Sequence, residues 1–328
     1  MPVPAADSPF AVSEEVREAL DAGRPVVALE STIIAHGLPR PRNLRIAQEL
    51  EGLVRAEDAV PATIAVVDGR PHVGLGKAEL ERIANEDGIR KLGHRDLAPA
   101  MAAGVSGATT VSGTAFLAER FGIRVFATGG LGGVHRDWTR DQDESADLRL
   151  LARTPITVVC AGVKSILDVP ATLQRLETLG VGVIGYGTSE FPGFYLRSSS
   201  QPVDWTVRSP EEVAAVMRAH DALDDLDSAL IVANPVAEDE QLDPGLHDRV
   251  LAEALRACAR EGITGQAVTP FLLDRLVRGT DGASLEANVA AVRGNVRLAA
   301  RIAKAYADLA RTGDAYGAQA PAEDPRRA

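Results

Sequence analysis

The sequence is poor in cysteine and lacks a strongly apolar run of membrane-spanning length. Its two cysteines among 328 residues, Cys160 and Cys258, make no disulfide framework, which favours a reducing compartment. The longest charge-free stretch, 97–118, is built from alanine, glycine, serine and threonine, and is too weakly apolar for a membrane helix. The opening residues, MPVPAADSPF, show neither the basic nor the apolar region of a secretory signal. We therefore expect a cytoplasmic protein without a membrane span.

Positive charge is scarce, and lysine is scarcer still. Lys and Arg number 35 against 46 Asp and Glu, so the net charge of −11 argues against a general binder of nucleic acids or anionic membranes. Only four of the cations are lysines, so each lysine calls for an explanation. The content of 45% hydrophobic and 25% charged residues is that of an ordinary globular protein.

Short β-branched runs alternate with helical patterns along the chain. The apolar runs are uniform, as expected of strands covered on both faces of a sheet. The alternation predicts an α/β fold: an α/β/α sandwich with a mainly parallel central sheet and a helical C-terminal third. The expected strands are 25–30, 62–69, 124–130, 156–162, 181–187 and 228–234. The expected helices are 41–56, 78–85, 115–121, 143–152, 170–179, 210–219, 244–261, 270–278 and 283–310.

The chain contains no Pro/Gly/Ser-rich linker and no internal repeat, so we expect one domain. The predicted organisation is an N-terminal extension over 1–12, a single catalytic domain over 13–311 and a disordered tail over 312–328.

Two ionisable residues lie at strand ends, where ligands bind in open α/β sheets. Lys164 lies in an apolar loop, where a lowered pKa would allow its amine to act as a nucleophile. Arginine cannot deprotonate, so the arginine bias of this chain favours a chemical role over a lysine that reaches solvent from a loop. Glu30 ends an apolar strand, where a raised pKa suits a general acid. A salt bridge to an arginine is the alternative for Glu30.

Polar segments elsewhere could bind an anion or a metal ion. Lys91, beside Arg90, His94 and Arg95, could bind phosphate or could lie at a solvated helix start. The run 141–147 is dense in oxygen ligands for a hard cation such as Mg²⁺ or Mn²⁺, although Asp143 could instead cap a helix.

Two glycine-containing segments and the remaining lysines carry weaker signals. The amides of 107–110, which precede a helix, could face an anion. The GGLGG run at 129–133 lacks the spacing of a dinucleotide motif. Cys160 is expected to pack as a small apolar residue at a strand end. Lys77 and Lys304 are expected at the surface.

Ten segments, which span roughly residues 14–310, closely resemble the pseudouridine-5′-phosphate glycosidases, also called the indigoidine-synthase-A-like family. They are ALESTIIAHGLP (28–39), VGLGKAEL (73–80), KLGHRDL (91–97), GATTV (107–111), FATGGLGGVHR (126–136), ESADL (144–148), TVVCAGVKSILD (157–168), GYGTSEFPGFY (185–195), VANP (232–235) and TPFLLDRL (269–276).

The resemblance implies an α/β/α homotrimer that cleaves pseudouridine 5′-phosphate reversibly to ribose 5-phosphate and uracil. It implies one divalent ion per subunit, typically Mn²⁺, with Mg²⁺ or another ion as a substitute. It makes Glu30 the proton donor, Lys164 the nucleophile and Asp143 the metal ligand. The substrate contacts that it implies, or that we expect with it, are Lys91, Val111, Ser145, Ala146, Asp147, Thr110, His135 and Asn288.

A C–C glycosidic bond explains a lysine where ordinary glycosidases use a second carboxylate. The leaving atom is uracil C5, a carbon, so we expect ring opening with Glu30 as acid, addition of Lys164 at C1′ and an imine as electron sink. A class I aldolase-like Schiff-base lyase acting on another sugar phosphate is the alternative enzyme. A non-catalytic sugar-phosphate sensor would keep Lys91 but would not need Glu30 with Lys164.

Overall fold

The computed structural model describes residues 8–136, 138–223 and 225–312. Residues 313–328 of the expected disordered tail and the first seven residues of the N-terminal extension lie outside this part. The strands are β1 (Ala11–Val12), β2 (Val26–Glu30), β3 (Val60–Val67), β4 (Arg70–Val73), β5 (Arg90–Leu92), β6 (Gly107–Thr109), β7 (Val125–Ala127), β8 (Thr157–Cys160), β9 (Gly182–Tyr186), β10 (Glu190–Phe191), β11 (Gln201–Pro202), β12 (Trp205–Val207) and β13 (Leu230–Ala233).

The helices are α1 (Glu14–Asp21), α2 (Arg42–Ala56), α3 (Lys77–Asn85), α4 (Leu97–Ala103), α5 (Val111–Arg120), α6 (Trp138–Asp141), α7 (Ala146–Leu151), α8 (Val169–Thr178), α9 (Pro210–Asp221), α10 (Pro244–Arg260), α11 (Val268–Gly279) and α12 (Ala283–Thr312). Short helical turns span Ile33–Gly37, His94–Asp96 and Gly265–Ala267. None of the helices in the described part of the chain combines the length and the hydropathy that a membrane crossing requires.

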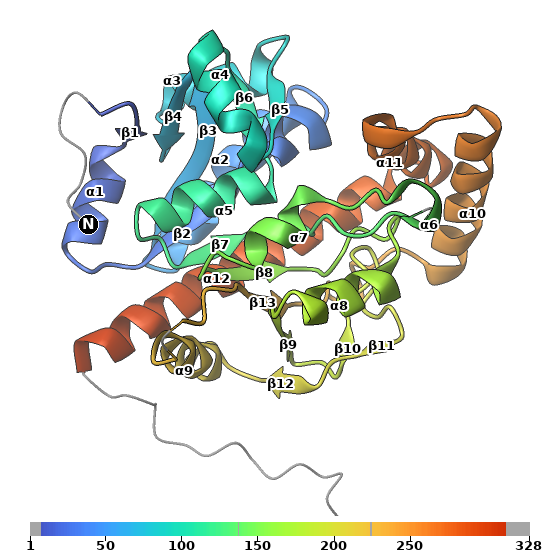
Figure 1. Cartoon of the computed structure of the whole chain (residues 1–328). Helices are drawn as coiled ribbons and strands as arrows, with labels where there is room; N and C mark the ends of the chain where they lie inside the picture. Colours follow the sequence, from blue (N-terminus) through green and yellow to red (C-terminus); the bar gives the residue numbers. More distant parts are fainter. Residues whose placement is uncertain (1–7, 137, 224, 313–328) are drawn as a thin grey trace, which may run out of the picture.

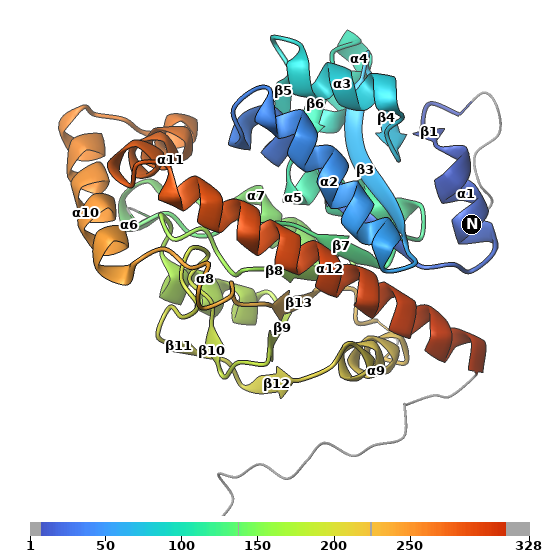
Figure 2. The ribbon, with the colours of Figure 1, turned by 180° about the vertical axis from the view of Figure 1, so that it is seen from behind.

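The predicted α/β/α sandwich with a mainly parallel sheet is confirmed. Within the described residues the main sheet runs β1-β4-β3-β2-β7-β8-β13-β9-β12, with β5 and β6 joined to it through β3. Strands β3, β2, β7, β8, β13, β9 and β12 pair in parallel, whereas β3 pairs antiparallel with β4 and β6. Helices α5, α7 and α8 lie on one side of this sheet (Figure 1), and α2 and α12 cross the other (Figure 2).

The uniform apolar character of the predicted strands follows from burial on both faces. In β2, Val26 and Ala28 belong to one hydrophobic core, and Val27 and Leu29 belong to the core on the opposite face. The long helix α12 packs against α2, α9 and strands β7 and β8, so α12 is part of the sandwich, whereas α10 and α11 pack on each other.

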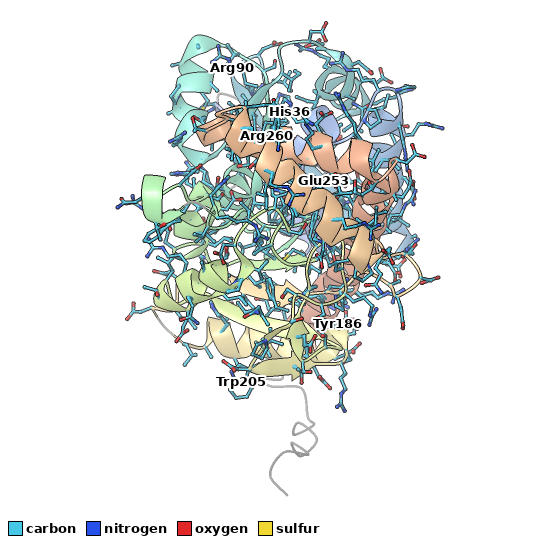
Figure 3. The ribbon with its side chains drawn as sticks, turned by 90° about the vertical axis from the view of Figure 1, so that its right-hand side faces the viewer. His36, Arg90, Tyr186, Trp205, Glu253 and Arg260 are labelled. Atoms are coloured by element: carbon cyan, nitrogen blue, oxygen red, sulfur yellow. The ribbon has the colours of Figure 1, made fainter. Side chains whose placement is uncertain are left out.

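Several short strands are absent from the sequence prediction. The turn between β3 and β4 has positive φ angles at Asp68 and Gly69, which is the hairpin chemistry that an Asp-Gly pair favours. Residues 11–12 of the expected N-terminal extension join the sheet as β1, which pairs with β4. Trp205, on strand β12 at the end of the sheet, is 73% exposed and is visible at the lower edge of Figure 3.

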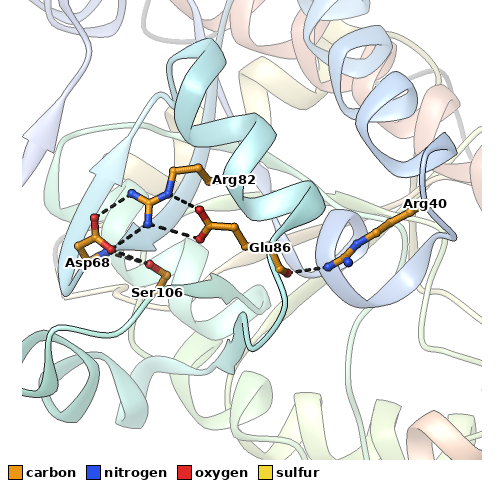
Figure 4. Close-up of polar contacts among 5 residues, drawn as sticks. All are labelled: Arg40, Asp68, Arg82, Glu86 and Ser106. Carbon is orange, nitrogen blue, oxygen red and sulfur yellow. Dashed lines mark hydrogen bonds and ion pairs between the residues drawn. The ribbon is translucent and has the colours of Figure 1, made fainter.

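Arginine ion pairs join neighbouring elements at the surface. The Arg82 guanidinium on α3 donates to both carboxylate oxygens of Asp68 in the β3–β4 turn, at 2.8 and 2.9 Å, and also pairs with Glu86 (Figure 4). Lys304 pairs with Asp58 at 2.7 Å, and Lys77 is 4.0 Å from Glu81. Both lysines are exposed, as predicted, and their charges are satisfied by simple surface pairs.

Candidate active site

The carboxyl ends of three adjacent strands carry the central groups of the site. Glu30 is the last residue of β2, Thr128 directly follows β7, and Lys164 lies in the loop after β8. Because β2, β7 and β8 are parallel neighbours, their carboxyl ends meet at one edge of the sheet. Thr128 Oγ1 donates a hydrogen bond of 2.5 Å to Glu30 Oε1. The site therefore lies where the strand-end argument predicts it.

Glu30 is a half-buried residue with a desolvated carboxyl group. Desolvation raises the pKa of Glu30 above its usual range, and this effect outweighs the opposing one of the Lys164 ammonium and of the Thr128 hydrogen bond. Asp147 raises this pKa further, and Lys91 lowers it. The pKa of Glu30 is therefore shifted upward, as the sequence analysis expects of a general acid.

Lys91 lies on β5, within electrostatic reach of the same carboxyl group. Desolvation lowers the pKa of the Lys91 ammonium, and the like charge of Lys164 lowers it further. Asp147 and Glu30 act in the opposite direction. Lys91 lies in a strand, paired with Ala108, and not at a helix start, although the residue is exposed as the alternative expected. Glu30, Lys91, Asp147 and Lys164 thus form one cluster of charged groups from four separate segments.

Asp147 is buried in α7, and its carboxylate binds two backbone amides from other segments. Its Oδ1 accepts from Ser112 N in the first turn of α5 at 2.9 Å, and its Oδ2 accepts from Gly132 N at 3.1 Å. A Cβ at Gly132 would lie only 2.2 Å from Ser145 Oγ, so this position of the GGLGG run needs glycine for close packing. Of the amides of 107–110, for which an anion was expected, those of Thr109 and Thr110 donate instead to Ser31 Oγ and Leu92 O, at 2.9 Å each.

The Lys164 loop is held through its backbone. Lys164 N donates to Leu131 O at 3.2 Å, and Leu131 N donates to Gly162 O at 2.9 Å. The Lys164 side chain is half-buried, and Ile166 and Leu167 behind it are 2% and 3% exposed. The nucleophile predicted from the apolar loop is therefore anchored against the loop that follows β7.

His135 and Asp143 lie together in the segment between β7 and α7. His135 N donates to Asp143 O at 3.1 Å, and His135 Nε2 is 3.8 Å from Asp143 Oδ2. No group of three or more His, Cys, Asp or Glu side chains suited to a metal occurs in the described residues. A single carboxylate oxygen donor, with water in the remaining positions, nevertheless fits a hydrated Mg²⁺ or Mn²⁺ ion. Asp143 does not cap the following helix, because α7 begins at Ala146 with Ser145 as its N-cap.

The other predicted contact residues lie around the same strand ends. Thr110 is the N-cap residue of α5, and Val111, the first residue of that helix, is 1% exposed. Ser145 Oγ accepts from Asp147 N at 3.2 Å, and Ala146 is exposed. Asn288 on α12 carries a buried Oδ1 for which no hydrogen-bond partner exists among the described residues. A Cβ placed on Gly129, next to Thr128, would lie 3.1 Å from that oxygen.

Three residues that support the site have no role in the sequence analysis. Thr128 holds the Glu30 carboxyl group. Asn295 on α12 is fully buried, and its Nδ2 donates to Thr128 O at 2.8 Å. Asn234, after β13, donates from Nδ2 to Asn295 Oδ1 at 2.9 Å. Thr128 and Asn234 could have been found in the sequence, because each is the polar residue that directly follows an apolar strand, β7 or β13. Asn295 had only the weaker signal of a polar residue among apolar neighbours in a helix.

Cys160 ends β8 and is fully buried, as predicted. Burial raises the pKa of its thiol to about 12, so the residue is an inert packing group.

Comparison with known proteins places this geometry in one family. The profile of the family described as indigoidine synthase A like protein matches residues 15–305. The pseudouridine-5′-phosphate glycosidase of Streptomyces griseus subsp. griseus is 75% identical over 297 residues, which span 90% of this chain and 92% of that protein. The enzyme of the same name from Salinispora tropica is 60% identical, over 89% of this chain and 90% of that protein.

Two solved structures have the same fold as this chain. The prealnumycin C-glycosynthase AlnA, determined in complex with ribulose 5-phosphate, superimposes with a TM-score of 0.86 and 38% identity, over 92% of this chain and 98% of AlnA. An indigoidine synthase A-like protein from Thermotoga maritima superimposes with a TM-score of 0.82 and 34% identity, over 93% of this chain and all of that protein.

Proposed function

The chain belongs to the indigoidine synthase A like family, and we propose that it cleaves the C–C glycosidic bond of pseudouridine 5′-phosphate reversibly, giving ribose 5-phosphate and uracil. The observation that carries this proposal is the cluster at the strand ends. There, a carboxyl group with a raised pKa faces a lysine amine, with a second lysine and a buried aspartate beside them. An acid and an amine nucleophile are what the scission of a bond to a carbon leaving group requires.

Glu30 acts first, as the general acid. Its raised pKa favours the protonated form that a general acid needs. As the C1′–O bond of the ribose ring breaks, the uracil ring supplies the electron pair and the ring oxygen takes the proton of Glu30. The hydrogen bond from Thr128 holds the carboxyl group for this transfer.

Lys164 then acts as the nucleophile. Its nitrogen forms a bond to C1′ with its lone pair, and the electron pair that joined C1′ to C5 as a double bond returns to uracil. The proton that the nitrogen then loses balances the one that uracil C5 gains. The C1′–C5 bond breaks with its electron pair remaining on uracil, while the nitrogen lone pair forms the C1′–N double bond. Water adds at C1′ and displaces the amine, which yields ribose 5-phosphate and free Lys164.

The remaining residues bind and orient the substrate. Lys91 supplies positive charge for the phosphate, and Asp147 fixes the start of α5 against the loop at Gly132. Asn288 offers to a donor group of the substrate an amide oxygen that has no partner among the described residues. We assign further contacts to Thr110, Val111, His135, Ser145 and Ala146.

We place a divalent ion, Mn²⁺ or Mg²⁺, at Asp143 beside His135. When bound, it supplies positive charge that stabilises anionic groups of the substrate. On the family resemblance, we also propose a cytoplasmic homotrimer.

Release of uracil tests the reaction. Purified protein with Mn²⁺ and pseudouridine 5′-phosphate should liberate uracil, and ribose 5-phosphate with uracil should lose free uracil in the reverse direction. Absence of both changes would overturn the proposal. Formation of an imine with another sugar phosphate, without uracil chemistry, would support the aldolase-like alternative.

Borohydride trapping tests the role of Lys164. Reduction during turnover should add a ribose-phosphate increment to this one lysine, which peptide mass spectrometry locates. Lys77, an exposed lysine outside the site, is the internal control within the same digest. A peptide with unmodified Lys164 under turnover conditions would contradict the mechanism.

A further inference from the structure

A cavity of about 480 Å³ lies next to the loop that carries Lys164. Ser165 lines it, but none of the catalytic, substrate-binding or metal-binding residues assigned above is among the described residues of its wall. A cavity of this size accommodates a small ligand. Its wall therefore differs from that of the active site, although it borders two loops of that site, at Ser165 beside Lys164 and at Arg136 beside His135.

Two arginines line this cavity, and both have neutral partners. Arg136 donates to the backbone oxygens of Ser165 and Ile166 at 3.0 and 3.2 Å. Arg197 Nη1 donates to Val236 O at 2.9 Å. Neither guanidinium forms an ion pair with any carboxylate in the described part of the chain. Each side chain is therefore held in place, and its positive charge has no carboxylate partner among the described residues.

The one carboxylate in the described wall, Asp248, is already engaged. Its Oδ1 lies 3.0 Å from Nδ1 of His247, and His247 Nε2 lies 2.8 Å from Ser165 Oγ. The rest of the polar wall comes from neutral groups, among them Gln241, which accepts from Arg197 N at 3.2 Å. Guanidinium groups that have no carboxylate partner in the described part of the chain, set among neutral hydrogen-bonding residues, form an environment suited to a phosphate group.

We propose that this cavity binds a small phosphate monoester or inorganic phosphate, at a site distinct from the active site. Arg136 and Arg197 bind the phosphate oxygens through the N–H groups that the backbone contacts leave available. Arg136 also donates to two carbonyl groups of the loop after Lys164. The bound anion would therefore contact a side chain that itself contacts this loop.

Equilibrium dialysis of the full chain with radiolabelled inorganic phosphate tests this site. The active site also binds phosphate if Lys91 has its proposed role, so the measurement is made in a Lys91→Gln background. We expect one phosphate per chain in that background. Adding Arg197→Gln should weaken this binding by about tenfold or more, and Arg197→Lys, which keeps the charge, should weaken it less.

Arg17→Gln is the matched control, because Arg17 also donates to one backbone oxygen, that of Val12, at 3.2 Å. It should leave phosphate binding unchanged, and thermal melting should show that every variant is folded. No saturable binding up to about 10 mM phosphate in the Lys91→Gln background, or equal binding after Arg197→Gln, would overturn the site. Equal displacement by acetate would overturn its assignment to phosphate. None of these outcomes depends on uracil release, so the site and the proposed reaction fail separately.

Discussion

Two glutamates in this molecule have similar immediate surroundings, but we expect only one of them to take part in catalysis. Glu51 on α2 accepts a hydrogen bond of 2.6 Å from Thr63 Oγ1, as Glu30 does from Thr128. Desolvation raises the pKa of both carboxyl groups, and the threonine lowers both. The difference lies in the next neighbours. Glu51 faces Arg55 of its own helix and Glu15, whereas Glu30 faces Lys164, Lys91 and Asp147 from three other segments.

A buried acid with a raised pKa therefore does not by itself make an active site. Arginine beside Glu51 can only pair with it, because its guanidinium stays protonated. Lysine beside Glu30 can lose its proton and react. The pairing of an acid with a group that can become a nucleophile separates the two regions, and the following variants probe that difference in order of expected effect.

Lys164→Arg should have the largest effect. It keeps a positive charge beside Glu30 but removes the nucleophilic amine, so uracil release should fall by roughly 10⁴-fold or more. A steady-state assay of uracil release measures this. A variant that retains substantial activity would show that Lys164 contributes only its charge, and the contrast with Arg55 would lose its basis.

Glu30→Gln should lower kcat by roughly 10²- to 10⁴-fold, because the amide cannot donate the proton to the ring oxygen. Glu51→Gln is its matched control and should leave kcat unchanged. Comparable losses in both variants would mean that burial of a carboxyl group, rather than its role as an acid, limits activity.

Activity should decline as the pH rises through the raised pKa of Glu30, because the protonated acid is then lost. Lys91→Gln removes a cation that lowers this pKa, so the alkaline limb of the kcat profile should move to higher pH. The profile of Glu51→Gln should match that of the unmodified protein. A limb that moves to lower pH in Lys91→Gln would show that a different group titrates.

The two threonines provide the smallest and most direct contrast. Thr128→Val and Thr63→Val each remove one hydrogen bond to a carboxyl group, and each should lower the free energy of unfolding by about 1 kcal/mol. Only Thr128→Val should move the alkaline limb upward, because the lost hydrogen bond lowered the pKa of Glu30. Urea unfolding and pH–rate profiles measure the two effects, and a shift in both variants would remove the distinction.

The parts of the fold that could be predicted from the sequence are those encoded by burial. Strands such as β2 and β8 are covered on both faces, so their residues are uniformly apolar. Strand β5 escaped prediction because Arg90 and Lys91 are exposed and its place depends on pairing with β6. The first turn of α5 escaped as well, because its Ser, Gly and Thr are weak helix formers. The Asp68-Gly69 pair is a hairpin signal, but the sequence analysis included both residues in the expected strand 62–69.

The residues of the candidate site also divide into those that local sequence indicates and those that depend on tertiary contacts. Glu30 and Lys164 could be predicted because each is a charged residue at the end of an apolar run. Asp147 was implied by the family motif, but its two backbone contacts depend on the tertiary approach of α5 and the Gly132 loop. Asn295 could not be predicted, because its partners lie 61 and 167 residues away in the sequence.

The hydrogen bond from Asn295 to the backbone of Thr128 has a consequence for the order of synthesis. Ribosomes make β2, β7 and β8 long before α12, so a nascent chain carries Glu30 and Lys164 while the residue that steadies Thr128 is still missing. The support that Asn295 gives to Thr128, and through it to Glu30, is therefore added only when the last helix emerges and docks.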